Sequence, residues 1–434
     1  MVYDAEWLRE AFVKHLSVFT NRRRTVFGRA LDYTLFVSEG DHWRHTRRIV
    51  SPEFSSGKIK RMMPTIQDCI LLFVSNLDKS NEKPIYFRRN CYALLLDIVS
   101  HTAFGLESDT QTNEDSQFTQ NALRLVNNAE YKKTLKQKLI TGLALILFIW
   151  APTWVVRLAA NSFNIALLDI EALGYLEQIC EKVIANRKSG SPEPSFVQTL
   201  VDSLVEAPKG HPDTLVDTNG LLWSKQGLTS QGIVGNALVF LTAGFVTTSN
   251  TLLFAFYELA QHPHIQEQLY EEIMEIFHTD DITPEQINEA KLLEYCINET
   301  LRLYPIGFRF DRATTEDVTI RDIFVPKGTM VTAAPWTIHR EPEIWEHPED
   351  YDPYRFLPDR FTQKQNTAYM PFGIGNRACI GQRLAQLEMK MTLILTLKRF
   401  IVCTCEDTPE RPIKFAPVPA ITPEKKIMLR FVKR

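Results

Sequence analysis

The sequence predicts a mainly α-helical protein with small β-sheets. Apolar residues recur with the helical period of 3.6 in long segments, whereas β-like pieces rich in Val, Ile and Thr are short and bounded by Pro326 and Gly328. No Gly/Ser/Pro-rich linker divides the 434 residues, although this length exceeds what one hydrophobic core usually supports. The length allows two domains or one large fold, and because no linker is present we expect a single large domain, residues 1–434.

Helical periodicity defines most of the expected elements. The first is a charged, amphipathic helix at Met1–Lys14, which has no apolar run that could serve as a signal peptide or membrane anchor. The other expected helices are Ser55–Leu77, Tyr92–Ala103, Ile165–Lys188, Gln231–Gln261, Ile265–Phe277, Thr283–Leu303 and Ile380–Phe400. Strands are expected at Val318–Ile320 and Thr329–Ala333, and the polar stretch Ser189–Ser224 is expected to be a loop with at most a short helix.

The longest apolar run, Leu139–Val156, has two interpretations. It reaches the length of a membrane-spanning helix only by including Pro152, and Trp150 and Trp154 suit the depth of a membrane interface. It is either a buried core helix or a helix that contacts a membrane surface, and nothing in the sequence is expected to span the bilayer.

Composition excludes several classes of protein. The net charge of −3, from 49 basic and 52 acidic residues, argues against a general nucleic-acid binder. The seven cysteines are odd in number, scattered and without a C-x-x-C pair. They are typical of reduced thiols in a cytosol-facing protein, not of a disulfide framework or a zinc site.

One cysteine lies in a glycine-rich loop before a predicted helix, where residues 372–385 read FGIGNRACIGQRLA. A helix N-terminus stabilises a thiolate, which is the form of cysteine that binds metals. Gly375 and Gly381 would let backbone and helix lie close to a flat ligand, and Arg377 offers a planar set of donors to a carboxylate. The spacing therefore predicts that Cys379 ligates a cofactor with acidic groups; the alternative is an ordinary buried cysteine in a helix-capping loop.

The pattern F-x-x-G-x-R-x-C-x-G-x-x-x-A resembles the haem-binding loop of the cytochrome P450 family. The resemblance implies the cytochrome P450 fold, haem b (iron protoporphyrin IX) as cofactor, Cys379 as the thiolate ligand of its iron, and Arg377 as a ligand of a haem propionate. The implied cofactor-binding positions in this loop are Phe372, Gly375, Arg377, Cys379, Gly381 and Ala385. The resemblance extends from Ser17 to about Arg430 and is closest to the microsomal branch that contains drug-oxidising enzymes and thromboxane synthase.

Three further segments match positions that bind the propionates in this family. Trp43 and Arg47 fit its W-x-x-x-R pattern, although a solvated basic helix face is the alternative. Arg312 matches an arginine that closes on the second propionate. Arg22, in the string SVFTNRR, matches another propionate-binding arginine.

A structural triad is also implied. Glu299 and Arg302 lie at i and i+3 on one predicted helix face, where they can pair. In the family this E-x-x-R binds a third residue, an arginine, and the candidates are Arg355 and Arg360. We choose Arg355, because the preceding PEDY at residues 348–351 matches the family's P-E-x-F and the distance of 24 residues to Cys379 is typical.

Oxygen chemistry is expected on the helix Gln231–Gln261. In the family, A-G-x-(D/E)-T makes room for dioxygen over the iron and guides protons to it, and Ala243, Gly244 and Thr247 match this pattern. Val246 stands where the acid is usual. Valine cannot relay a proton, so the relay must rely on Thr247, Thr248 and water.

The expected function is a haem-thiolate monooxygenase. It would activate O₂ with electrons from NADPH, through NADPH-cytochrome P450 reductase with cytochrome b5 as a further partner, and oxidise a small apolar substrate such as a steroid, lipid or xenobiotic. The basic residues Lys58, Lys60, Arg61, Arg383 and Lys390 are candidates for a reductase-binding surface, or form a solvated mixed-charge face.

Two alternatives remain open. One is a reductase-independent peroxide isomerase resembling thromboxane synthase, which would need no proton relay; the other is a haem-free remnant without activity. The resemblance implies the cytosolic face of the endoplasmic reticulum membrane, with membrane-surface contact. Relatives carry an anchor and the first sheet strands before the equivalent of Ser17, so we expect the chain to be N-terminally incomplete.

Overall fold

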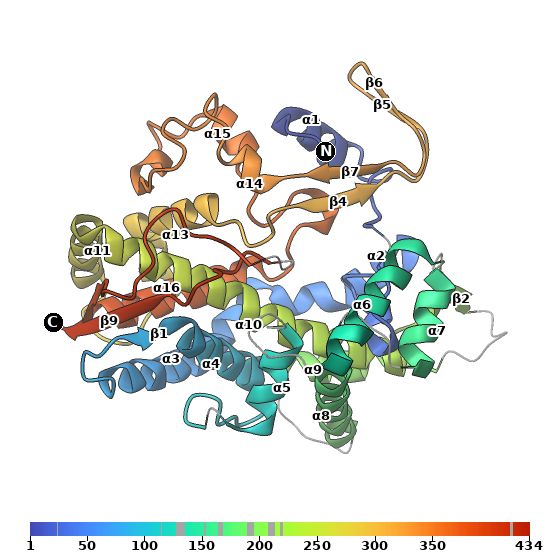
Figure 1. Ribbon diagram of the computed structural model, residues 1–434, viewed down its shortest axis with the longest axis horizontal. Coiled ribbons are helices and arrows are strands. Elements are labelled where there is room, and N and C mark those ends of the chain that lie inside the picture. The colour runs from blue at the N-terminus through green and yellow to red at the C-terminus, as the bar shows by residue number, and fades with distance from the viewer. Residues whose placement is uncertain are drawn as a thin grey trace. The chain divides into compact units, whose positions relative to one another are not determined.

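The computed structural model describes residues 1–23, 25–113, 115–126, 135–151, 153–163, 168–188, 195–206, 213–217, 220–416 and 420–434. Helices and short antiparallel sheets make up these residues (Figure 1). The chain forms two compact units: unit 1 comprises Met1–Thr20, Ser56–Leu95 and Val246–Arg434, and unit 2 comprises Asn21–Ser55 and Leu96–Phe245. The mainly α fold class with small β-sheets is confirmed.

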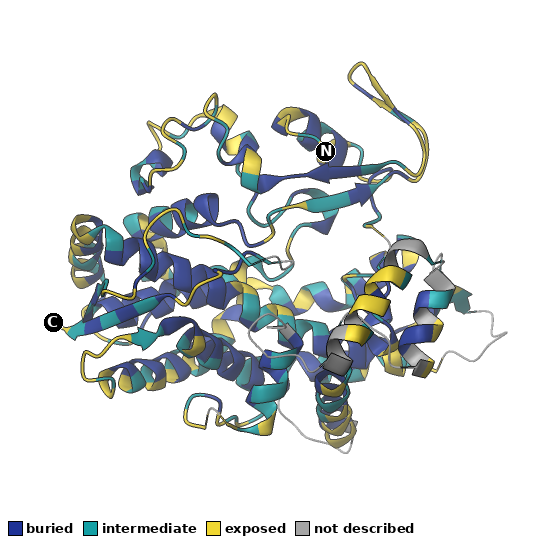
Figure 2. Cartoon of the chain, in the orientation of Figure 1, coloured by how far each residue is buried: buried dark blue, intermediate teal, exposed yellow. Residues whose placement is uncertain are grey.

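The helices of unit 1 begin with α1 (Ala5–Arg9), which continues as the π-helix η1 (Glu10–Lys14). Its later helices are α3 (Ser56–Asp78), α11 (Pro263–Ile276), α12 (Pro284–Glu289), α13 (Lys291–Leu303), α14 (Pro335–Ile338), η5 (Pro353–Phe356), α15 (Gln363–Ala368), η6 (Gly375–Arg377) and α16 (Gln382–Leu397). Every residue of α16 from Leu387 to Leu397 is buried (Figure 2). The helix that follows the cysteine loop is therefore a core element.

In the part of unit 1 that the structure describes, the strands form three small antiparallel sheets. The largest has the order β1-β9-β8, with β1 at Ile85–Tyr86, β8 at Phe400–Cys403 and β9 at Met428–Lys433. Strand β4 (Phe310–Ala313) pairs with β7 (Met330–Ala333), so that Arg312 lies opposite Val331, and β5 (Val318–Ile320) pairs with β6 (Ile323–Val325). The strand predicted at Val318–Ile320 is thus confirmed with the same bounds, and that at Thr329–Ala333 to within one residue.

Unit 2 contains α2 (Gly40–Val50), which carries the W-x-x-x-R pattern. Its other elements are η2 (Arg29–Tyr33), η3 (Ser51–Phe54), η4 (Ser100–Phe104), α5 (Gln117–Val126), α6 (Leu135–Trp150), α7 (Thr153–Phe163), α8 (Ile170–Lys188), α9 (Phe196–Asp202), β2 (Thr214–Val216) and β3 (Leu222–Ser224). Helices α4 (Phe87–Val99) and α10 (Ser230–Gln261) contribute residues to both units.

Two predicted elements differ from the structure. The helix expected at Thr283–Leu303 is two helices, because the backbone leaves the helical region at Ala290 and the carboxylate of Glu272 accepts hydrogen bonds from the backbone N–H groups of Leu292 and Leu293 at 2.7 and 3.0 Å. This distant carboxylate starts α13 anew. The loop expected at Ser189–Ser224 contains not only α9 but also the antiparallel hairpin β2–β3, in which Leu215 lies opposite Trp223.

The long apolar run is divided between α6 and α7, and its first part is not buried as a core helix would be. Leu139, Leu143, Leu145 and Ile146 of α6 are exposed, whereas Ala144 is buried. Within the described residues, α10 is long and apolar enough to cross a membrane, but 61% of its most apolar window is buried inside the protein. This burial is typical of a core helix.

Candidate active site

The cysteine loop presents Cys379 just before α16. Gly373 and Gly375 adopt positive φ angles of 70° and 74°, which turn the chain, and the backbone N–H of Cys379 donates to the carbonyl of Phe372 at 2.9 Å. Gly381 is the N-cap residue of α16, and Ala385 closes the first turn with a bond from its N–H to the carbonyl of Gly381. The exposed thiol therefore lies at the N-terminal end of a helix of 16 residues, where a thiolate is stabilised.

Gly375 is required by a contact that the sequence did not predict. A Cβ at this position would lie 2.0 Å from the carbonyl oxygen of Phe12 in η1. The side chain of Asn376 also donates to the carbonyl of Leu16 at 3.2 Å. The contact of the loop with the N-terminal helix and the positive φ of this residue both require glycine here.

Two buried arginines flank this loop within unit 1. Arg377 is 3% exposed, and its Nε donates to the carbonyl of Thr20 at 2.9 Å. Arg312 of β4 is 1% exposed; its Nη2 donates to the carbonyl of Ile374 at 3.4 Å, and its guanidinium lies over the ring of Phe310. A guanidinium offers a planar set of donors that matches a carboxylate, so both arginines are candidates for binding one.

The remaining predicted propionate ligands lie in unit 2. Trp43 is buried and Arg47 half-buried, one turn apart on α2. Arg22 lies with its guanidinium 4.5 Å from the ring centroid of Phe36, and the neighbouring Asn21 accepts a hydrogen bond from the backbone N–H of Gly40, the first residue of α2, at 2.9 Å. This bond ties the segment that carries Arg22 to the helix that carries the other two residues.

On α10, Ala243 and Thr247 share an exposed face, whereas Gly244 lies toward α4. Ala243 and Thr247 are exposed and lie one turn apart, whereas Phe245 between them is fully buried. A Cβ on Gly244 would approach Cγ2 of Val99 to 2.7 Å, so that glycine is needed for the packing of α10 on α4. Val246 is half-buried and offers no proton.

Sequence reasoning missed one acidic residue near these threonines. Glu388 of α16 is buried, and its carboxyl accepts a hydrogen bond from the hydroxyl of Thr248 on α10. Burial raises the pKa of Glu388 to about 8, and the bond from Thr248 acts in the opposite direction. The available signal was an acidic residue inside the apolar stretch that forms the buried part of α16.

The structural triad is assembled in unit 1. Glu299 accepts from Arg302 Nε at 2.7 Å and Nη2 at 2.8 Å, and from Arg355 Nε at 3.2 Å, with all three side chains buried. The alternative, Arg360, donates instead to Asp352 at 2.9 Å on the surface. The arginine chosen by its flanking sequence is therefore the one that contacts Glu299.

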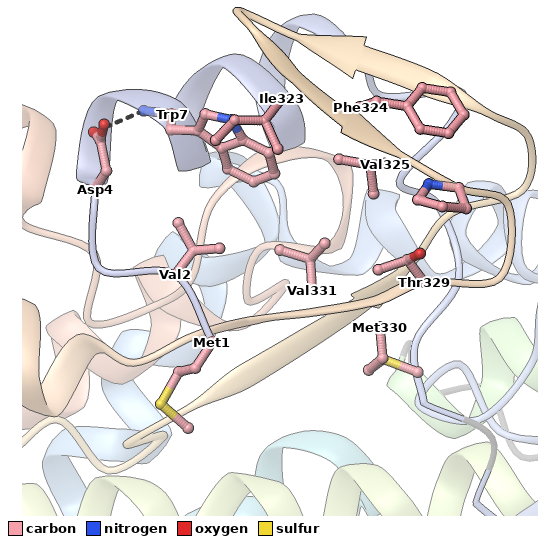
Figure 3. Close-up of a pocket in the computed structure, with 11 residues that line it drawn as sticks. Met1, Val2, Asp4, Trp7, Ile323, Phe324, Val325, Thr329, Met330 and Val331 are labelled. Carbon is pink, nitrogen blue, oxygen red and sulfur yellow. Dashed lines mark hydrogen bonds between the residues drawn. The ribbon is translucent and has the colours of Figure 1, made fainter.

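Two other clusters do not belong to this site. A pocket of about 300 Å³ is lined by apolar residues of the N-terminus, β6 and β7, including Trp7, Phe324 and Val331, and by no predicted site residue (Figure 3).

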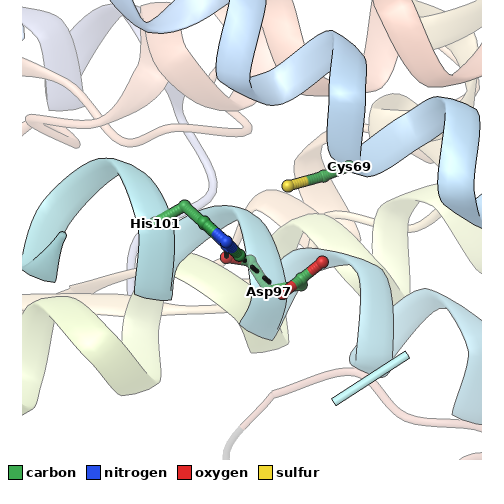
Figure 4. Close-up of side chains that lie close together, drawn as sticks. All are labelled: Cys69, Asp97 and His101. Carbon is green, nitrogen blue, oxygen red and sulfur yellow. Dashed lines mark hydrogen bonds and ion pairs between the residues drawn. The ribbon is translucent and has the colours of Figure 1, made fainter. Parts of the chain in front are cut away.

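In unit 2, Nδ1 of His101 lies 3.3 Å from Oδ1 of Asp97 (Figure 4). Since Ser108 and Gln111 also donate to this carboxylate, the pair is a satisfied structural contact.

Comparisons with known proteins agree with this geometry. The sequence model of the cytochrome P450 family matches residues 1–431. Cytochrome P450 3A29 of Sus scrofa is 32% identical over 440 residues, in an alignment that covers 100% of this chain and 82% of the relative. Cytochrome P450 3A25 of Mus musculus is 31% identical over 444 residues with the same coverage, and cytochrome P450 3A5 of Homo sapiens 29% identical over 443 residues, again with the same coverage.

The cysteine before a buried helix, with its guanidinium neighbours, is typical of the haem-thiolate oxidoreductases. The chain belongs to the cytochrome P450 family. It is a monooxygenase that uses haem, O₂ and NADPH-derived electrons supplied by a reductase partner, and it acts on apolar substrates. The peroxide isomerase alternative is not favoured.

The residues present fit the haem that this family uses. The thiol of Cys379 is accessible at the helix start, and the buried guanidinium groups of Arg377 and Arg312 lie beside the same loop. Haem offers an iron that accepts a thiolate and two carboxylates that accept from arginine, so the donor set matches both features.

Proposed function

We propose that Cys379 is the thiolate that ligates haem iron in this monooxygenase. The observation that carries this proposal is the accessible thiol at the start of α16, held by the bond from its own N–H to Phe372. Arg377 and Arg312 in unit 1, and Arg22, Trp43 and Arg47 in unit 2, are the proposed ligands of the haem carboxylates. Phe372, Gly381 and Ala385 shape the loop and the helix turn around the sulfur.

When bound, haem supplies the iron at which O₂ is reduced. We propose that Ala243 and Gly244 leave room for O₂ on α10, because neither carries a side chain larger than a methyl group. Thr247, an exposed residue on the same helix face as Ala243, orients a proton donor with its hydroxyl. Since Val246 cannot hold a proton, water must deliver it to this hydroxyl.

The proposed substrates are small apolar molecules such as steroids, lipids or xenobiotics. This proposal rests on the resemblance to the drug-oxidising branch and on the exposed apolar residues of α6, the helix predicted to contact the membrane. The exposed leucines and isoleucine of α6 are suited to a membrane surface, where such substrates concentrate. We accordingly place the protein on the cytosolic face of the endoplasmic reticulum membrane.

We propose NADPH-cytochrome P450 reductase as the electron donor, with cytochrome b5 as a further partner. Lys60, Arg61 and Arg383 are exposed basic residues of unit 1 that could meet an acidic partner surface. Lys390 does not belong to this set, because it is buried and its Nζ lies 3.2 Å from a carboxylate oxygen of Glu294.

We further propose that residues 1–434 form a single cytochrome P450 domain, because both units are discontinuous in the sequence.

The difference spectrum of the reduced protein with carbon monoxide tests the ligand assignment. We expect the red-shifted Soret band of thiolate-ligated haem in the wild type and its loss in Cys379→Ser. A matched control is Cys403→Ser, a half-buried cysteine of β8, which should leave the band unchanged. A red-shifted band that persists in Cys379→Ser would contradict the assignment, and turnover without NADPH would contradict the monooxygenase chemistry.

A further inference from the structure

Helix α2 is held by an element that the sequence did not predict, the hairpin β2–β3. Asp217 directly follows β2, and its Oδ2 accepts a hydrogen bond from Nδ1 of His42 on α2 at 2.9 Å. The two side chains are 5% and 2% exposed. Asp217 is itself fixed by the hairpin, because its Oδ1 accepts from the backbone N–H of Leu221 at 2.9 Å.

The ring of His42 is also held on its face. It stacks on Trp223 of β3, with ring centroids 5.4 Å apart and an interplanar angle of 10°. One edge of the imidazole is thus bonded to the end of β2, and one face is packed against β3. Residues of both strands therefore determine where this side chain lies.

A second contact follows three residues later on α2. Arg48 donates to Nδ1 of His45 at 3.1 Å, so Nε2 carries the hydrogen that is donated to the carbonyl of Gly227 at 3.2 Å. Burial lowers the pKa of His45, and the positive charge of Arg48 adds to this effect. Gly227 admits no side chain, since a Cβ would lie 2.1 Å from the carbonyl oxygen of Ser203.

These two contacts set the rotation of α2 about its axis. His42 immediately precedes Trp43, and His45 lies two residues before Arg47. Because side chains reach roughly 5–6 Å from a helix axis, a rotation of about 10° would move their ends by about 1 Å. A displacement of this size matters for hydrogen bonds to a bound carboxylate.

We propose that the hairpin β2–β3 is a latch for α2, and that Asp217 and His42 are positioning residues that direct Trp43 and Arg47 toward a haem carboxylate. This inference rests on the proposed role of Trp43 and Arg47 as propionate ligands. His42 and Asp217 are 5% and 2% exposed, so the latch acts through α2 and not through a surface of its own.

The test measures the rate of haem transfer from the holoenzyme to apomyoglobin, together with the resonance Raman bands of the haem propionates. Asp217→Ala should accelerate haem loss by about tenfold, as expected when a residue that orients a ligand is removed. Asp217→Asn keeps an acceptor for His42 and should restore most of the wild-type rate. Asp213→Ala is the matched control, because Asp213 accepts a hydrogen bond from Gln226 of the same hairpin.

A double mutant separates positioning from a general loss of stability. In Trp43→Phe/Arg47→Ala, adding Asp217→Ala should not accelerate haem transfer further, because the two side chains that the latch positions are already replaced. Additive effects, or unchanged propionate bands in Asp217→Ala, would overturn the proposal. If Asp217→Ala does not fold, Trp223→Leu serves instead, because it removes the stacking alone. It should shift the propionate bands in the same way and change the rate of haem transfer less. Unchanged propionate bands in Trp223→Leu would overturn the proposal as well.

Failure of the latch is distinguishable from failure of the proposed function. If Trp43→Phe and Arg47→Ala themselves leave haem transfer unchanged, the assignment of the propionate ligands is wrong. If these two variants lose haem faster while Asp217→Ala behaves like Asp213→Ala, the ligands are right and the latch is wrong.

Discussion

Arg302 and Glu299 are joined by two parallel hydrogen bonds in the fully buried interior of unit 1, from Nε to Oε2 at 2.7 Å and from Nη2 to Oε1 at 2.8 Å. The remaining nitrogen of Arg302, Nη1, donates to the carbonyls of His339 and Pro348. One side chain thus fixes α13 against the segment that leads to the cysteine loop.

Replacing Arg302 should therefore prevent the protein from holding its cofactor. Arg302→Ala leaves Glu299 with Arg355 as its remaining buried cation and leaves the carbonyl groups of His339 and Pro348 without this donor, at a cost of about 3–5 kcal/mol. We expect insoluble or haem-free protein, measured as the haem-to-protein ratio after purification. Arg360→Ala removes an arginine from the exposed pair with Asp352 and should be near neutral. A soluble, haem-replete Arg302→Ala protein would refute the structural role.

Val246 allows a direct test of proton supply. Val246→Glu places a carboxyl beside Thr247 on α10, and we expect product to form faster, by up to about a hundredfold if protons limit the reaction, with more product per NADPH consumed. Val246→Gln has nearly the same shape without a titratable proton. Equal coupling in the Glu and Gln variants would show that an acid at this position does not matter.

Glu388 should make stability fall as the pH rises. Burial raises its pKa from 4.5 to about 8, so the folded protein keeps a proton that the unfolded chain releases. Its contribution is complete below pH 4.5 and is lost up to about pH 8, at no more than about 1.4 kcal/mol per pH unit. Glu388→Gln stays neutral and should flatten this slope in melting temperatures measured from pH 5 to 8. The same slope in both proteins would rule out this titration.

His339 should make the stability of the folded protein fall as the pH decreases. Its Nε2 accepts the N–H of Met370 at 3.0 Å, and Nδ1 lies 3.3 Å from the carbonyl of Arg302. Burial, aided by the charge of Arg302, lowers the pKa of His339 from 6.5 to about 3. Its neutral form therefore stabilises the fold above pH 6.5, and that stability is lost as the pH falls toward 3. His339→Gln, which cannot take up this proton, should resist acid better; equal acid midpoints would contradict the assignment.

Local patterns predicted most helices, because a long helical periodicity of apolar residues, such as that of α10, is a property of one continuous segment. The break at Ala290 was not predictable, since the carboxylate that starts α13 belongs to Glu272, about 20 residues earlier. The hairpin β2–β3 was missed for a similar reason. Its strands have only three residues each, and their stacking on α2 depends on His42, far away in the sequence.

The candidate site was predictable where spacing within one segment carries the chemistry, as in the loop around Cys379 and the Glu299–Arg302 pair. It was not predictable where two distant segments meet. Glu388 and Thr248 belong to different helices, and neither has a local motif that indicates the bond between them. The reason for Gly375 likewise lies in Phe12, which is not part of the loop pattern.

The contact between Gly375 and the carbonyl of Phe12 has a consequence for biosynthesis. The N-terminal turn leaves the ribosome long before its partner, by roughly 20–70 s at 5–20 residues per second. The thiol-bearing loop can take up this contact only when all the residues from Phe12 to Gly375 have been made. Insertion of the prosthetic group is thereby postponed until this loop has been translated, and a nascent chain stalled before it would be a poor haem acceptor.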